Sequence, residues 1–181
     1  MKSRSSRGHE AQTKNSQSLL TSVATSQRML ILIANRQRTK KINSRRLKQI
    51  VAALFAELEI SKAELGINLV NAKGMARVNW QFLQHEGSTD VITFDHRNHE
   101  SPITNHEPTI HGELFVCVAA AVAQAKEFKT SWQSEVVRYV VHGVLHLLGH
   151  DDSKPALRRK MKRAENRLVR LLAKRFSIAR F

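Results

Sequence analysis

The chain has 181 residues and one cysteine, which indicates one domain without an intramolecular disulfide. No apolar run reaches the ~18 residues that a membrane-spanning helix requires. Thirty Lys and Arg against 15 Asp and Glu give a net charge of +15, which favours a polyanionic partner such as nucleic acid or a nucleoprotein particle. An anionic membrane surface is the main alternative partner.

Residues 1–28 are predicted to be a disordered basic extension. They are rich in Ser, Thr, Gln, Lys and Arg and contain few large apolar side chains, so they cannot bury a core. An organelle transit peptide has a similar composition, but the weak amphipathicity of the stretch favours the tail of a cytoplasmic protein. The folded domain is expected at 29–175, followed by a basic tail at 176–181.

Hydrophobic periodicity predicts strands and helices that intermix along the domain. The predicted elements are, in chain order, a strand at 29–34, a helix at 44–58 capped by Asn43 or Ser44, a strand at 65–70, a helix at 72–83, a strand at 88–94, a long loop at 95–108, a strand at 112–118, a helix at 119–127, a helix at 131–148 ended by Gly149, and a last helix capped by Ser153 with Pro155 in its first turn. This order predicts an α/β fold of the α+β type, in which one small sheet is covered by helices.

Two histidines on the predicted helix 131–148 indicate a metal site. His142 and His146 are four residues apart, which puts them on one helix face with Cβ atoms about 5–6 Å apart. Neutral imidazole suits zinc, copper, nickel or iron, and zinc is the usual metal of hydrolases. Such a pair can also be structural, but the apolar neighbours predict burial, where unpaired imidazoles would be costly.

The third ligand can come from the turn after the helix, which offers His150, Asp151 and Asp152. Three protein ligands would leave one position for water, as in catalytic zinc sites. The residue after the first histidine is Gly143, where zinc peptidases of the His-Glu-x-x-His type carry the Glu that acts as general base. This glycine argues against the common peptidase mechanism.

The histidine segment and several upstream stretches carry a specific combination of motifs. Residues 142–149 and Asp151 match the pattern His-Gly-x-Leu-His-Leu-x-Gly-Tyr-Asp-His. Asn79 followed by residues 89–94 is similar to an Asn followed by Thr-Asp-Val-Leu-Ser-Phe, and residues 112–114 are similar to Gly-Asp-Leu or Gly-Glu-Leu. Over roughly residues 29–175 the chain thus resembles the YbeY family, bacterial endoribonucleases of rRNA maturation.

The resemblance implies a single domain with a mixed four-stranded sheet and one zinc ion bound near one end. It also implies single-strand-specific RNA cleavage in rRNA processing and ribosome quality control, with single-stranded or ribosomal RNA and ribosomal particles as partners, no membrane, and a cytoplasmic location. The family's third histidine falls at Asp152, and a carboxylate can replace imidazole on zinc. The predicted metal ligands are therefore His142, His146 and Asp152, with His150, at the family's Tyr position, as the alternative third ligand.

A second departure from the family concerns an Arg that many members carry behind an aromatic residue in the second helix. Here Leu83 stands at that position, behind Phe82. In the family this Arg is associated with activity. His85 or Arg77 could supply positive charge in its place.

Three further residues are candidates for the catalytic machinery. Glu135 and Arg138 precede His142 on the same helix face, where Arg138 could contact phosphate and Glu135 could orient a ligand histidine. A surface ion pair is an equally open interpretation of these two. Glu113, near the start of a strand, is the third candidate.

The predicted last helix and the residues after it are strongly basic, which favours contacts with phosphate over a merely solvated face. Against Glu165 alone, the basic residues are Lys154, Arg158, Arg159, Lys160, Lys162, Arg163, Arg167, Arg170, Lys174, Arg175 and Arg180.

The leading hypothesis is a zinc-dependent endoribonuclease, in which water on the metal or the 2′-OH of the RNA attacks phosphorus. The alternatives are a non-catalytic ribosome-assembly factor with a structural metal and, third, a metallopeptidase.

Overall fold

The computed structural model describes residues 29–97 and 108–180, so the predicted extension at 1–28 and most of the predicted loop at 95–108 lie outside the described residues. The strands are β1 (Met29–Asn35), β2 (Lys62–Val70), β3 (Val91–Asp95) and β4 (Thr109–Cys117). The helices are α1 (Ser44–Glu57), α2 (Ala72–Leu83), α3 (Val118–Glu127), α4 (Trp132–Leu147) and α5 (Pro155–Arg175), followed by the 3-10 helix η1 (Ile178–Arg180).

The four strands form one mixed sheet in the order β1-β2-β4-β3. β1, β2 and β4 are parallel, whereas β3 is antiparallel to β4. The predicted α/β fold of the α+β type, with a mixed four-stranded sheet covered by helices, is therefore confirmed. Within the part of the chain that the structure describes, no helix is both long and apolar enough to cross a membrane.

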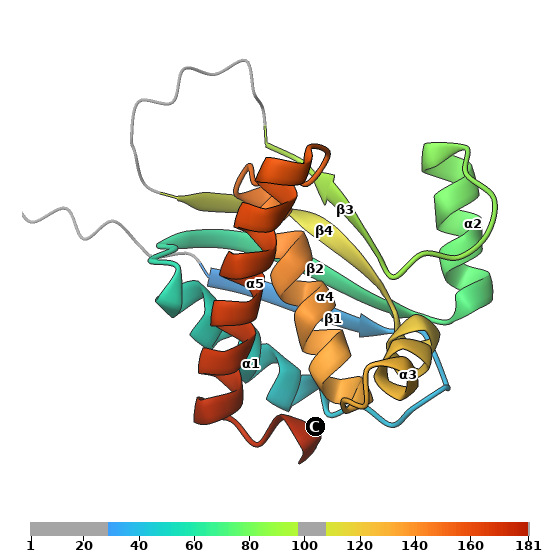
Figure 1. Ribbon diagram of the computed structural model, residues 1–181, viewed down its shortest axis with the longest axis horizontal. Helices are drawn as coiled ribbons and strands as arrows, with labels where there is room; N and C mark the ends of the chain where they lie inside the picture. The colour runs from blue at the N-terminus through green and yellow to red at the C-terminus, as the bar shows by residue number, and fades with distance from the viewer. Residues whose placement is uncertain (1–28, 98–107, 181) are drawn as a thin grey trace, which may run out of the picture.

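One face of the sheet carries most of the core. α1 and α4 pack on this face, and α5 packs against both of them (Figure 1). The apolar residues predicted for one face of α1, from Leu47 to Phe55, are buried, and the Asn43 side chain caps the helix by accepting a hydrogen bond from the backbone N–H of Arg46 at 3.0 Å. On the other face, α2 covers a smaller cluster that includes Met75 and Ile92.

The start of α5 differs from the prediction that Ser153 caps the helix. The N-cap residue is Lys154, which makes no side-chain capping bond. Ser153 instead donates to the carboxylate of Asp151, from its backbone N–H at 2.8 Å and from its hydroxyl at 2.7 Å. The serine thus shapes the turn before the helix, because a short polar side chain competes as well for a turn as for a cap.

The segment 176–181, set apart in the sequence as a basic tail, continues the fold over its described residues. Ile178 in η1 is buried in the main core, and the side-chain amide of Gln133 on α4 donates to the carbonyl of Ala179 at 2.8 Å.

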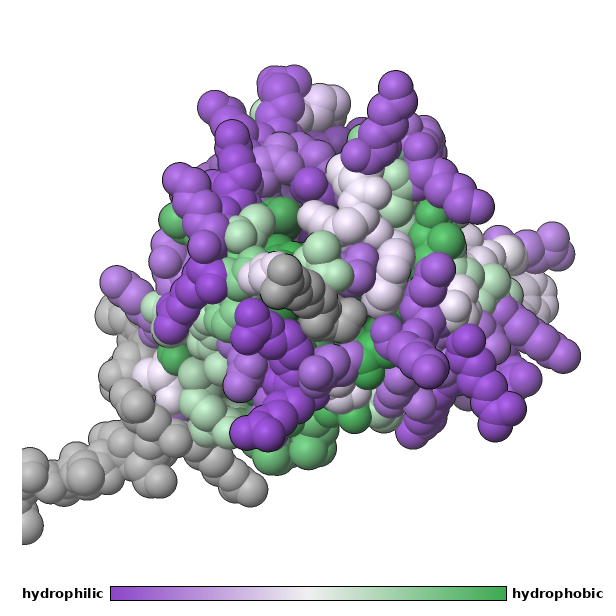
Figure 2. Space-filling model, turned by 90° about the horizontal axis from the view of Figure 1, so that it is seen from below, coloured by the Kyte–Doolittle hydropathy of each residue, from purple (hydrophilic) through white to green (hydrophobic). Residues whose placement is uncertain are grey.

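Figure 2 views the molecule from the bottom of Figure 1 and shows hydrophilic side chains projecting over most of this face, with apolar patches between them.

Two glycines allow α4 to approach the sheet closely. A Cβ atom on Gly143 of α4 would lie 2.5 Å from Leu114 Cδ2 on β4 and 3.2 Å from Thr93 Oγ1 on β3. A Cβ atom on Gly112 of β4 would clash with the carbonyl oxygen of Phe94 and lie 2.8 Å from Leu147 Cδ2 on α4. The helix that carries the two histidines is therefore fixed at a short distance from the β3–β4 pair.

We expect Gly112→Ala to destabilise the protein by about 1–3 kcal/mol, because the added methyl group meets backbone and a packed leucine that cannot move aside. Urea unfolding measures the loss as a lower midpoint at unchanged m value. Gly66→Ala is the matched control, since its Cβ would meet only the flexible side chain of Glu113 at 3.0 Å. Equal stability of Gly112→Ala and the wild type would contradict the close approach.

Candidate metal centre

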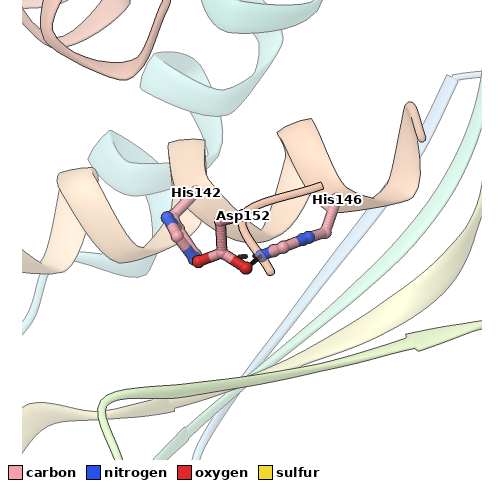
Figure 3. A group of neighbouring side chains, drawn as sticks. All are labelled: His142, His146 and Asp152. Carbon is pink, nitrogen blue, oxygen red and sulfur yellow. Dashed lines mark hydrogen bonds and ion pairs between the residues drawn. The ribbon is translucent and has the colours of Figure 1, made fainter. Parts of the chain in front are cut away.

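The side chains of His142 and His146 converge below α4, as the sequence predicts. Their Nε2 atoms are 3.0 Å apart. The carboxylate of Asp152 faces both of them, with Oδ2 at 3.8 Å from His142 Nε2 and Oδ1 at 3.9 Å from His146 Nε2 (Figure 3). Within residues 29–97 and 108–180, these three side chains form the one group of His, Cys, Asp and Glu that could hold a metal ion.

Hydrogen bonds at the far ring nitrogens fix how the two imidazoles face each other. His146 Nδ1 lies 3.0 Å from the carbonyl oxygen of His150, which can only accept, so this nitrogen carries the proton. His142 Nδ1 lies 3.1 Å from Glu165 Oε2 and donates to this carboxylate in the same way. Both Nε2 atoms therefore present lone pairs to the same point, which fits a metal ion bound by two imidazoles and one carboxylate.

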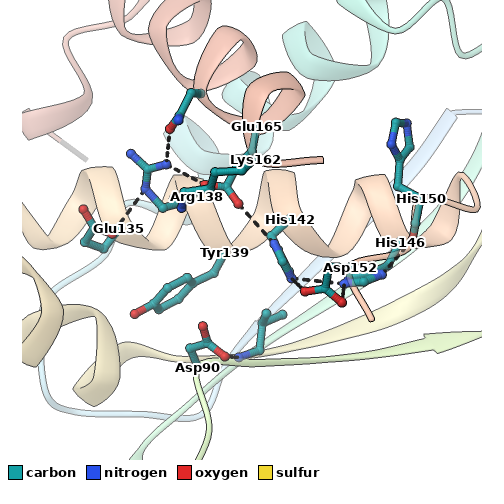
Figure 4. A network of polar contacts seen from close by, with 12 residues as sticks. Asp90, Glu135, Arg138, Tyr139, His142, His146, His150, Asp152, Lys162 and Glu165 are labelled. Carbon is teal, nitrogen blue, oxygen red and sulfur yellow. Dashed lines mark hydrogen bonds and ion pairs between the residues drawn. The ribbon is translucent and has the colours of Figure 1, made fainter. Parts of the chain in front are cut away.

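The turn after α4 brings Asp152 back over the histidines and leaves His150 outside. Gly149 adopts φ +85°, its N–H donates to the carbonyl of His146 at 2.8 Å, and the N–H of His150 donates to the carbonyl of Leu145 at 3.0 Å. The His150 imidazole then points away from the pair (Figure 4). The next residue, Asp151, is taken up by Ser153, whose hydrogen bonds lower the pKa of the Asp151 carboxyl.

Behind His142 lies a buried carboxylate from α5. Glu165 is 3% exposed and accepts hydrogen bonds from His142, from Arg138 Nη1 at 2.6 Å and from Lys162 Nζ at 2.9 Å (Figure 4). Burial alone would raise the pKa of Glu165, but the hydrogen bonds from His142, Lys162 and Arg138 outweigh it and lower the pKa to about 2. An ionised Glu165 therefore holds His142 in orientation.

The other predicted residues of α4 lie beside this network. Glu135 is buried and accepts from the hydroxyl of Thr130 at 2.6 Å, and its second oxygen lies 3.4 Å from Arg138 Nε. Arg138 thus bridges two buried carboxylates, Glu135 and Glu165. The contact with the histidine that the sequence suggested for Glu135 is made by Glu165 instead.

Glu113 lies on the opposite face of the sheet from α4. It alternates with Leu114, which packs under Gly143, and its carboxylate accepts from Asn68 Nδ2 at 3.4 Å. The structure therefore does not bring Glu113 to the histidines.

Two clefts meet at His142, which lines both of them. The first, of about 740 Å³, runs between the ends of α3, α4 and α5 and is lined by His142 and Asp152. The second, of about 790 Å³, lies between the segment after α2 and α4 and is lined by Leu83, His85 and both histidines. Asp90 lines both clefts, which the sequence did not indicate. His85, one of the two residues suggested to supply the positive charge of the family's Arg, lines the second cleft.

Comparisons with known proteins point to one family. A family model described as Endoribonuclease YbeY matches residues 32–173. The chain belongs to this family. A protein named Endoribonuclease YbeY from Salinibacter ruber is 32% identical over 72% of the chain and 84% of its own length, and one of that name from Chlorobium phaeovibrioides is 30% identical over 70% and 80%.

A solved structure supports the fold alone. The solution structure of TM1509 from Thermotoga maritima matches with a TM-score of 0.57 and 24% identity, over 79% of this chain and 89% of that one. Membership in the family confirms the predicted resemblance and the predicted class of enzyme, a hydrolase that acts on RNA as an endoribonuclease.

We expect Glu165→Gln to weaken binding of a divalent metal ion by about 10- to 100-fold, because the amide no longer offers a charged acceptor to His142 Nδ1. A competition titration with a coloured chelator measures the change. Glu57→Gln is the matched control, since Glu57 also ties another helix to α5, through Arg167 at 3.0 Å, but touches neither histidine. Metal affinity equal to wild type in a folded Glu165→Gln variant would rule out the orienting contact.

Proposed function

We propose that the protein is a zinc-dependent endoribonuclease that cleaves single-stranded RNA in rRNA maturation and ribosome quality control, with ribosomal particles as its cytoplasmic partners. The observation that carries the proposal is the convergence of two imidazole Nε2 atoms and one carboxylate where two clefts meet, in a chain of an endoribonuclease family.

One zinc ion would be held by His142, His146 and Asp152, a donor set that leaves one position open. When bound, zinc supplies a Lewis acid for a phosphoryl oxygen and lowers the pKa of a water toward about 7. The chain itself keeps the ligands in place. Glu165 holds His142, and the carbonyl of His150 holds His146, so neither ring has to reorient when RNA arrives.

Phosphate binding falls to the cations of α5. Arg138 and Lys162 are committed to buried carboxylates, whereas Arg158 and Arg159 line the first cleft beside His142. Charged donors of this kind attract phosphate, and the net charge of +15 extends the attraction over the whole surface.

The position of the metal ligands beside two clefts supports the proposed single-strand specificity. A flexible strand can bend through both clefts and expose its backbone to the site, whereas a rigid A-form duplex keeps its strands paired along a regular helix. Leu83, which is 46% exposed in the second cleft, supplies no charge there, so the α5 side carries the stronger hold on phosphate.

A peptidase is disfavoured by the packing around Gly143. A side chain at this position would point into Leu114 rather than toward the histidines, so the helix cannot carry the general base of the His-Glu-x-x-His enzymes. A non-catalytic assembly factor would share the basic surface and the metal, and differs in binding RNA without cutting it.

The function is tested by cleavage of one labelled RNA presented as a single strand, as a duplex and as DNA of the same sequence. We expect cuts in the single-stranded RNA alone, loss of cleavage with a chelator, return of cleavage on adding zinc, and no cleavage by a variant with both His142 and His146 changed to Ala.

Binding of the single strand without cleavage at any zinc concentration would select the assembly factor, and hydrolysis of casein in place of RNA would select the peptidase.

The third ligand is tested by comparing two neighbours. We expect Asp152→Ala to lower zinc affinity by far more than the ~10- to 100-fold that a residue outside the ligand set costs, and His150→Ala to cost less than this, because the His150 imidazole faces away. Asp152→His should retain the metal, since imidazole is also a zinc ligand. Loss of zinc from His150→Ala, with zinc retained by Asp152→Ala, would reverse the assignment.

A further inference from the structure

We propose that Phe128 and Gln124, at the α3 end of the first cleft, form a nucleobase subsite in which one base of a bound RNA strand stacks on the Phe128 ring and is contacted by the amide of Gln124. The inference rests on the proposed function and adds to it the residues that hold a base next to the cleavage centre.

The Phe128 side chain is exposed, and the backbone that carries it is fixed by hydrogen bonds. At 59%, its exposed fraction is the largest among the large apolar side chains of the described residues, and the ring lines the same cleft as His142. The chain around it is a tight helix end. The N–H of Phe128 donates to the carbonyl of Gln124 at 2.9 Å, Lys129 adopts φ +53°, and the N–H of Thr130 donates to the carbonyl of Ala125 at 2.9 Å.

The turn is also anchored from the side of α4. The hydroxyl of Thr130 donates to the buried carboxylate of Glu135 at 2.6 Å. Single exposed apolar side chains are common and need no explanation. An aromatic residue on a hydrogen-bonded turn that lines the same cleft as His142, however, has the position and the flat face that base stacking requires.

Gln124 adds a hydrogen-bonding group with a fixed direction. The buried Tyr139 hydroxyl donates to Gln124 Oε1 at 2.9 Å, which leaves the Gln124 Nε2 group as a donor, and no acceptor for it occurs in the part of the chain that the structure describes. Burial, and after it the charge of Asp90, raises the pKa of Tyr139, so the hydroxyl stays a donor. The amide nitrogen can then donate to a carbonyl or ring nitrogen of a base.

The charges in the cleft are distributed as a nucleotide needs them. Arg158 and Arg159 stand on the α5 side, where a phosphate would lie, and Phe128 and Gln124 form an uncharged end. The acids of the cleft are occupied. Glu135 and Glu165 pair with cations, Asp152 faces the histidines, and Asp90 accepts from the N–H of Val91 at 2.8 Å. Single-stranded RNA combines a flat base with an anionic backbone and fits this arrangement, whereas an apolar peptide would leave the cations unmatched.

The test compares Phe128→Leu, Phe128→Trp and wild type for binding of a labelled single-stranded RNA, measured by fluorescence anisotropy with a chelator present to stop cleavage. We expect Phe128→Leu to raise Kd by roughly five- to a hundredfold, and Phe128→Trp to restore binding, because stacking needs an aromatic face. The dependence of binding on salt should not change, since no cation is removed. Phe82→Leu is the matched control, because Phe82 is similarly exposed at 55% but lines neither cleft.

A set of RNAs, each lacking the base at a different position, distinguishes a loss of base stacking from a general structural effect of the substitution. At the position that occupies the subsite, wild type and Phe128→Leu should bind the abasic strand equally, whereas both Gln124→Leu and Tyr139→Phe should weaken binding of the intact strand a few-fold.

A Kd of Phe128→Leu equal to wild type, or a loss of the same size with every abasic strand, would overturn the subsite. Failure of the wild type to bind any RNA would instead refute the proposed function.

Discussion

The hydrogen bond between Glu165 on α5 and His142 on α4 joins the helix that carries the two histidines to the basic helix α5. A carboxylate that is 3% exposed is costly unless it is paired, and here a histidine, an arginine and a lysine provide the partners. Two of these partners belong to α4 and one to α5, so the same ion-paired group holds the helices together and sets the direction of a metal ligand. The strongly basic outer face of α5 is thereby fixed relative to the histidines.

The glycines at 112 and 143 place that unit on the sheet. Their missing side chains let α4 lie close to β3 and β4, so the histidines project from a helix that cannot move toward the sheet without a clash. This packing also explains why the residue after His142 is Gly143, since any side chain there would meet Leu114 on the sheet. The close contact between Gly143 and Leu114 thus excludes the general base of a peptidase and also keeps α4 rigid against the sheet.

Much of the fold could be predicted from the sequence because local patterns determine it. Apolar periodicity predicts the α-helices and strands of the described residues, though not η1, and the shared face of His142 and His146 follows from helix geometry alone. β2 and β3 begin at Lys62 and Val91 rather than at the predicted residues 65 and 88, because pairing with a neighbouring strand sets these starts.

The arrangement of the site could not be predicted in the same way, because it depends on contacts between elements that are distant in the sequence. The resemblance to the family favoured Asp152, but spacing alone could not separate it from His150, because the turn at Gly149 decides which side chain returns to the helix. In the sequence, Glu165 is named only as the single acid of a basic helix. It stands on the apolar stripe between Met161 and Leu168, where a lone acid signals a buried partner. Glu113 was a candidate by motif, and strand alternation turns it away.

As the proposed third ligand, Asp152 would give the centre a different charge from that of a site with three imidazoles. Three neutral imidazoles leave a divalent ion with its full +2, whereas two imidazoles and a carboxylate leave a formal +1. The ion would then be a weaker electrophile, and the oxygen donor would make the site more hospitable to harder metals such as manganese and ferrous iron, which favour carboxylate and mixed histidine–carboxylate sites. Which metal fills such a centre is set less by intrinsic affinity than by the supply of each ion in the cell. A single change of ligand can therefore tie the enzyme's activity to the metal status of its host.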